Sequence, residues 1–115
     1  ADAVIVSNHG GRHLDNTLAT IEVLPEVVAA VKGKIEIYLD GGIQRGADVV
    51  KAIALGAKAV FIGRPLFWGL AVGGEQGVVR VLNILREEIE LTMAKCGRPT
   101  IASIDATVVV KAPRL

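Results

Sequence analysis

Three short apolar runs constrain the fold of this chain more than any other feature of its sequence. They cover residues 3–6, 35–39 and 59–62. The first and third are nearly uninterrupted and rich in β-branched side chains, as is typical of strands buried on both faces of a parallel sheet. Segments with apolar residues at helical spacing follow the runs, over 21–32, 48–55 and 75–95. The order predicts an α/β fold with three strand–helix units, parallel strands and right-handed crossovers.

Open doubly wound sheets and closed barrels both fit this order of elements. Three strands alone cannot close a barrel, and a sheet of three strands leaves unpaired edges. The chain of 115 residues is therefore expected to be a piece of a larger α/β unit.

Composition excludes several classes of protein. Hydrophobic residues make up 51% of the chain, the net charge is +1, and acidic and basic residues are interleaved, which argues against a nucleic-acid-binding face. The apolar runs are too short to span a membrane. The single cysteine, Cys96, cannot form an intramolecular disulfide, so a reducing compartment such as the cytoplasm is the default, and its place near the apolar stripe of the last helix predicts a core residue.

Each apolar run leads directly into a polar loop that contains glycine. The loops cover 7–12, 40–42 and 63–65. In a parallel sheet all three loops emerge at the carboxyl ends of the strands, where α/β proteins bind their ligands. We therefore expect the three loops to build one site.

The first loop carries a base and a cation, His9 and Arg12, on either side of two glycines. Histidine gains and loses a proton near neutrality, and the planar guanidinium of arginine suits a carboxylate. The simpler interpretation is that His9 only hydrogen-bonds the loop while Arg12 pairs with Asp15. The two neighbouring loops favour the functional interpretation.

The second and third loops are suited to a phosphate. Gly41, Gly42 and Gly46 would expose backbone N–H groups, and the helix that begins near Ala47 would point its positive end at the loop. Gly63 and Arg64 would add another N–H group and a cation. The alternative is a tight turn capped by Asp40 and a surface ion pair for Arg64. Trp68, in a turn begun by a proline, and Met93 are interpreted as packing residues.

Residues 7–15 resemble the active-site signature of the FMN-dependent α-hydroxy-acid oxidases and dehydrogenases, the family of glycolate oxidase and the peroxisomal 2-hydroxyacid oxidases. Further matching segments are 39–46, 48–52, 55–57, 63–65 and 68–71. The resemblance covers nearly the whole chain. It implies that residues 1–115 are the C-terminal part of an FMN hydroxy acid dehydrogenase domain and supply the last three strand–helix units of a (β/α)₈ TIM barrel.

The resemblance also implies an activity: oxidation of a short, glycolate-like (S)-2-hydroxy acid to the 2-oxo acid, with FMN as cofactor and O₂ reduced to hydrogen peroxide. His9 would take the substrate proton, Arg12 would hold its carboxylate, and Ser7 would touch the flavin. The residues expected around the FMN phosphate are Asp40, Gly41, Gly42, Ile43, Gln44, Gly63 and Arg64. No metal is implied, and relatives form homo-oligomers, namely tetramers.

Two positions depart from the family pattern, because Gln44 stands where the family has arginine and His13 where it has glutamine. Two other functions compete with the oxidase: a non-catalytic half-barrel fragment, and another barrel enzyme that binds FMN or a sugar phosphate. Pro113, Arg114 and Leu115 resemble the C-terminal address of peroxisomal enzymes, which predicts a peroxisomal location.

Overall fold

A computed structural model describes residues 1–112 of the chain, so the predicted peroxisomal address at 113–115 lies outside the described residues. Three strands form one parallel sheet in the order β1-β2-β3. They are β1 (Ala3–Val6), β2 (Glu36–Asp40) and β3 (Ala59–Phe61). Helices α1 (Thr20–Val31) and α2 (Gly46–Ala54) connect them. The predicted α/β fold with parallel strands is confirmed.

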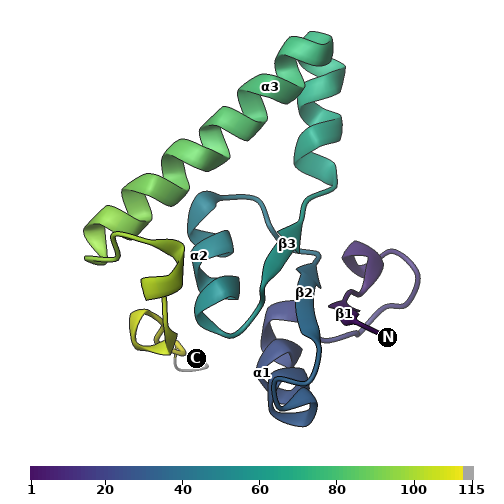
Figure 1. Ribbon diagram of the computed structural model, residues 1–115. Coiled ribbons are helices and arrows are strands. Elements are labelled where there is room, and N and C mark those ends of the chain that lie inside the picture. The colour runs from purple at the N-terminus through teal and green to yellow at the C-terminus, as the bar shows by residue number, and fades with distance from the viewer. Residues whose placement is uncertain (113–115) are drawn as a thin grey trace.

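The third helix is longer than the sequence predicts. Helix α3 (Arg64–Lys95) starts directly after β3 and is broken at Gly73 and Gly74, so it forms two antiparallel arms that rise away from the sheet (Figure 1). The prediction of a turn around Trp68 was wrong, because this segment is the first arm of α3, and Trp68 is 53% exposed rather than packed. Short 3₁₀ turns follow at Ile101–Ser103 and Ala106–Val108.

The core lies on one face of the sheet, between the strands and helices α1 and α2. Leu24 of α1 and Leu39 of β2 are completely buried there, and Ile37 is 6% exposed. A smaller cluster joins α2 to the end of the chain through Val50 and Ile104, with Met93 packed against it.

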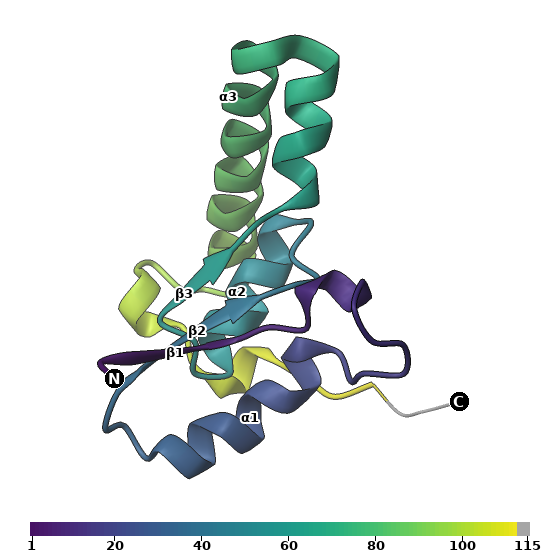
Figure 2. The ribbon, with the colours of Figure 1, turned by 90° about the vertical axis from the view of Figure 1, so that its right-hand side faces the viewer.

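The opposite face of the sheet is uncovered. Side chains alternate along a strand, so the residues between the core positions point to this second face. Ile5 of β1 and Phe61 of β3 are 51% and 47% exposed, and Phe61 contacts the Tyr38 ring edge-on. The predicted burial of the strands on both faces is therefore not found: α1 and α2 cover one face only (Figure 2).

Within residues 1–112, no helix combines the length and the apolar character needed to cross a membrane.

Candidate active site

Hydrogen bonds join the three strand-end loops at the carboxyl edge of the sheet. The Ser7 hydroxyl, after β1, donates to the Asp40 carboxylate at the end of β2, at 2.6 Å. The Arg64 guanidinium, after β3, donates from Nη2 to the Gly10 carbonyl at 3.0 Å. The parallel register aligns Val6 with Leu39, which brings the loops after β1 and β2 to the same level. The three loops therefore lie together, as the sequence predicts.

The first loop folds into a 3₁₀ turn at His9–Gly11 with an unusual backbone. His9, Gly10 and Gly11 all have positive φ, at 51°, 67° and 73°. Only glycine adopts this region without strain, so His9 is held in place by its surroundings. Asn8 caps the turn by accepting from the Gly10 N–H group at 3.0 Å, and the Ser7 hydroxyl accepts from the His9 N–H group at 3.2 Å.

A cavity of about 220 Å³ gathers nearly all the residues that the sequence singles out. Its lining includes the base and the cation of the first loop together with the glycine turns of the second and third. These residues are His9, Arg12, Asp40, Gly41, Gly42, Ile43, Gln44, Gly63 and Arg64, and Phe61 and Phe67 add apolar walls. Ser7 is absent from this lining, although its hydroxyl is bound to Asp40.

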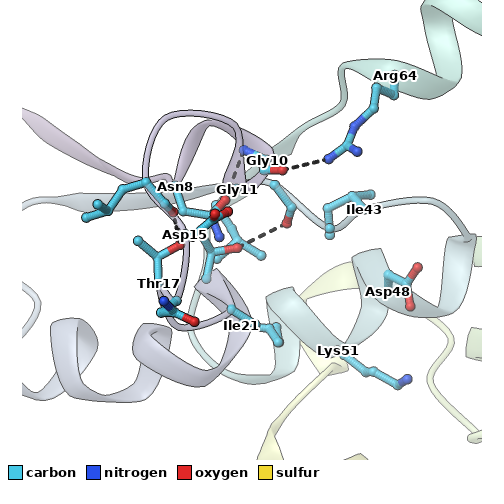
Figure 3. Close-up of a pocket in the computed structure, with 17 residues that line it drawn as sticks. Asn8, Gly10, Gly11, Asp15, Thr17, Ile21, Ile43, Asp48, Lys51 and Arg64 are labelled. Carbon is cyan, nitrogen blue, oxygen red and sulfur yellow. Dashed lines mark hydrogen bonds between the residues drawn. The ribbon is translucent and has the colours of Figure 1, made fainter.

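The same loops also line a second cavity, of about 450 Å³ (Figure 3). It extends over the start of α1 to Lys51 of α2. The residues that it shares with the first cavity are Gly10, Gly41, Gly42, Ile43 and Arg64. The candidate base, His9, does not line it. We therefore place the candidate chemistry in the smaller cavity, because that is the one that His9 and Arg12 share.

The glycines of the second and third loops leave room for a ligand. An added Cβ atom would meet nothing within 4 Å at Gly42 or at Gly63, and Gly42 has a φ of 80° that favours glycine. Gly41 serves the loop itself, because its Cβ would lie 2.9 Å from the Asn8 side chain. Open space beside the Arg64 cation suits an anionic group such as a phosphate.

The Gly46 N–H group at the start of α2 is not free for the phosphate that the sequence predicts there. The Gly46 N–H group donates to the Glu88 carboxylate of α3 at 2.6 Å. Asp48 accepts from the N–H groups of Gln44 and Arg45, at 3.2 Å and 3.0 Å. Two carboxylates thus occupy the positive end of this helix, and the prediction of a phosphate at Gly46 was wrong.

Three further side chains bear on the sequence interpretation. Ile43 is 6% exposed and its side chain belongs to the core, so only its backbone is available to a cofactor. Cys96 is exposed, and its prediction as a core residue was wrong because the last turn of α3 extends past the packed stripe. His13 lies with its ring edge-on to His9, 4.8 Å between ring centres, a contact that sequence spacing alone does not indicate.

The simpler interpretations of the two arginines find no support in residues 1–112, where neither Arg12 nor Arg64 forms an ion pair with a carboxylate. In the same range no cluster of three His, Cys, Asp or Glu side chains could hold a metal ion. The arrangement therefore offers a base, a carboxylate-type anchor and an anion cradle at one edge of a parallel α/β sheet.

This class of site agrees with what comparison with known proteins shows. Residues 1–111 match the family described as FMN-dependent dehydrogenase, and the chain belongs to this family. It is 59% identical over 112 residues to 2-hydroxyacid oxidase 1 of Mus musculus, covering 97% of this chain and 30% of that protein. It is 54% identical over 107 residues to L-lactate oxidase of Nostoc sp., covering 93% of this chain and 29% of that protein.

Solved structures agree. Mandelate oxidase with benzoyl-formic acid superimposes with a TM-score of 0.87 at 48% identity, over 90% of this chain and 31% of that chain. A mandelate oxidase variant with a monooxide FMN adduct has a TM-score of 0.86, also at 48% identity, over 90% of this chain and 33% of that chain. The chain thus spans about a third of the length of the relatives it matches, and the prediction of the FMN-dependent family is confirmed.

Proposed function

We propose that the full-length protein carrying this chain oxidises a short (S)-2-hydroxy acid to the 2-oxo acid with FMN as cofactor. Residues 1–115 would be the last three strand–helix units of a (β/α)₈ barrel. The observation that carries the proposal is the shared cavity, in which His9 and Arg12 face the Gly42 and Gly63–Arg64 turns. The named relatives include 2-hydroxyacid, L-lactate and mandelate oxidases, which favours a 2-hydroxy acid as substrate.

Arg12 anchors the substrate in this proposal. Its guanidinium can bind a carboxylate through two parallel hydrogen bonds, and these fix the position of the α-carbon. Arg12 and His9 line the same cavity and are separated in sequence by the Gly10–Gly11 pair. A small acid held by Arg12 would therefore present its hydroxyl group to the imidazole.

His9 acts as the base. Oxidation of a 2-hydroxy acid removes two electrons and two protons, and His9 would accept the proton that leaves the substrate. FMN, when bound, supplies the electron-accepting chemistry, and O₂ takes up the two electrons and two protons as hydrogen peroxide.

The cofactor phosphate is assigned to the third loop. Arg64 would provide the positive charge, and the open space at Gly42 and Gly63 would admit the phosphate oxygens. The Asp40 carboxylate repels a phosphate but accepts hydrogen bonds, so it suits the hydroxyl groups of the ribityl chain. Ser7, bound to Asp40, would face the same part of the flavin. Gln44 is uncharged, so Arg64 is the residue that we assign to balance the charge of the phosphate.

The experiment uses full-length protein loaded with FMN, with glycolate and longer 2-hydroxy acids as substrates and hydrogen peroxide as the readout. His9→Ala should lower kcat by at least about 100-fold, the usual effect of losing a general base. Flavin absorbance should show that the variant still binds FMN. Turnover of FMN-loaded His9→Ala within a few-fold of the unchanged enzyme would refute the role of His9.

One observation supports the competing interpretation, in which the chain is a non-catalytic half-barrel fragment. The sheet leaves Ile5 and Phe61 exposed on its uncovered face, and both β1 and β3 are edge strands. We therefore propose that the 115-residue chain needs the rest of the barrel for activity.

We also propose that the full-length protein forms a homo-oligomer, taken as a tetramer, and that it is located in peroxisomes. A relative 59% identical over 103 residues is named a peroxisomal (S)-2-hydroxyacid oxidase. Light scattering and a fluorescent fusion test these two points.

A further inference from the structure

Arg64 holds the loop that carries His9. Its Nη2 donates to the Gly10 carbonyl at 3.0 Å, across 54 positions of sequence. Gly10 directly follows His9, so this carbonyl belongs to the Gly10–Gly11 peptide unit, one unit beyond the candidate base. The contact links the loop after β3 to the loop after β1 at the wall of the candidate cavity (Figure 3).

The turn at His9 depends on contacts from outside. Three successive residues with positive φ do not persist in a free chain, least of all at the non-glycine His9. Ser7 and Asn8 hold the turn from the side of β1, through the N–H groups of His9 and Gly10. Arg64 holds it from the side of β3. The backbone that carries the imidazole is therefore held from two strands at once.

We propose that Arg64 is a positioning residue for His9, in addition to its part in binding the cofactor phosphate; this inference rests on the proposed function. A guanidinium has five N–H donors in a rigid plane, so one nitrogen can hold the Gly10 carbonyl while the others face an anion. Arg64 lines both cavities, so its other guanidinium N–H groups can bind an anion there. Lysine offers donors from a single nitrogen and cannot span both partners.

Gly10 and Gly11 provide a matched pair of substitutions. A Cβ atom on Gly10 would lie 2.6 Å from Nη2 of Arg64, whereas one on Gly11 would meet nothing within 4 Å. Both residues have similar φ values, 67° and 73°, so alanine costs similar backbone strain at either position. The difference between the two variants therefore reports the loss of the Arg64 contact.

The first measurement is hydrogen exchange of residues 7–14 in full-length protein, with and without FMN. Gly10→Ala and Arg64→Lys should each accelerate exchange by at least about 10-fold, which corresponds to about 1.4 kcal/mol. Gly11→Ala should exchange more slowly than Gly10→Ala. Arg86→Lys, which alters an exposed ion pair of α3, should match the unchanged protein, and exchange over β2 checks that each variant is folded.

Two results would overturn the proposal. One is exchange of residues 7–14 in Arg64→Lys within twofold of the unchanged protein. The other is acceleration in Gly11→Ala as large as in Gly10→Ala, because only a Cβ atom on Gly10 would displace the Arg64 guanidinium. If Gly10→Ala does not fold, the proposal is tested by comparing the exchange of residues 7–14 in Arg64→Lys with that in Arg86→Lys. Since exchange needs no turnover, this result stands whether or not the oxidase activity is found.

The second measurement separates positioning from phosphate binding. For Arg64→Lys, kcat should remain at least about 10-fold below the unchanged enzyme when FMN is saturating, because small displacements of a base are costly. Full recovery of kcat at saturating FMN would assign Arg64 to the phosphate alone. Flavin fluorescence measures the FMN affinity of the same variant independently.

Discussion

The contact between α2 and α3 leaves no room for a side chain at Gly46. Gly46 is buried at the first position of α2, and its N–H group donates to Glu88 of α3. A Cβ atom there would lie 2.4 Å from the backbone nitrogen of Ile89 and 2.5 Å from the carbonyl carbon of Glu88. Neither atom belongs to a flexible side-chain end, so Gly46→Ala must push the two helices apart.

The expected cost follows from three contributions. Overpacking costs about 1–3 kcal/mol, and weakening a hydrogen bond to a charged group costs about 1.5–3 kcal/mol. The helix preference of alanine over glycine offsets about 1 kcal/mol of this loss. We expect Gly46→Ala to lower the free energy of unfolding by about 3 kcal/mol.

Denaturant unfolding of the full-length protein, followed by circular dichroism, measures this loss. Gly73→Ala is the matched control, because Gly73 has a negative φ of −144° and nothing within 4 Å of an added Cβ atom. The control should unfold within about 0.5 kcal/mol of the unchanged protein, as surface substitutions do. A Gly46→Ala variant as stable as Gly73→Ala would show that the two helices yield without cost and would refute the reasoning.

Two further predictions concern the core and the C-terminal turn. Leu39→Ala empties a completely buried position and should cost about 2–5 kcal/mol in the same unfolding assay; a loss under about 1 kcal/mol would contradict the packing described. Hydrogen bonds from the Thr107 side chain and backbone, and then the charge of Arg98, lower the pKa of Asp105 below 3.8. Its contribution is therefore complete above pH 3.8 and lost as the pH falls through the lowered pKa. Protection of residues 105–109 from hydrogen exchange, measured relative to the intrinsic exchange rate at each pH, should fall in that acidic range, and Asp105→Asn should remove this change in protection.

Sequence patterns predicted the strands and the meeting of the three loops well, for local reasons. The β-branched runs have the length of strands, and the glycine loops follow them directly, so the parallel order alone places the three loops at one edge. His9, Arg12 and Arg64 line one cavity as the loop argument requires. Their catalytic and binding roles stay predictions until the variants are measured.

Long-range contacts account for what the sequence did not indicate. The Gly46 N–H group is bound by a carboxylate 42 positions away, and no local pattern signals that partner. The proline at the start of the first arm of α3 favoured a turn, yet this arm is helical, and it packs backbone to backbone against the second arm: a Cβ on Gly77 would lie 1.9 Å from the Gly69 carbonyl oxygen. The contact of Arg64 with Gly10 likewise exists only once the sheet has formed.

The chain reversal at Gly73 and Gly74 is a suitable place to attach a label. Both residues have open space around them, and the reversal lies at the far end of the arms from the sheet (Figure 1). A fluorophore or a short epitope attached between the two glycines would protrude into solvent without reaching the walls of either cavity. Binding experiments could therefore be read out from this point on the surface while the loops that carry His9 and Arg64 keep their native sequence.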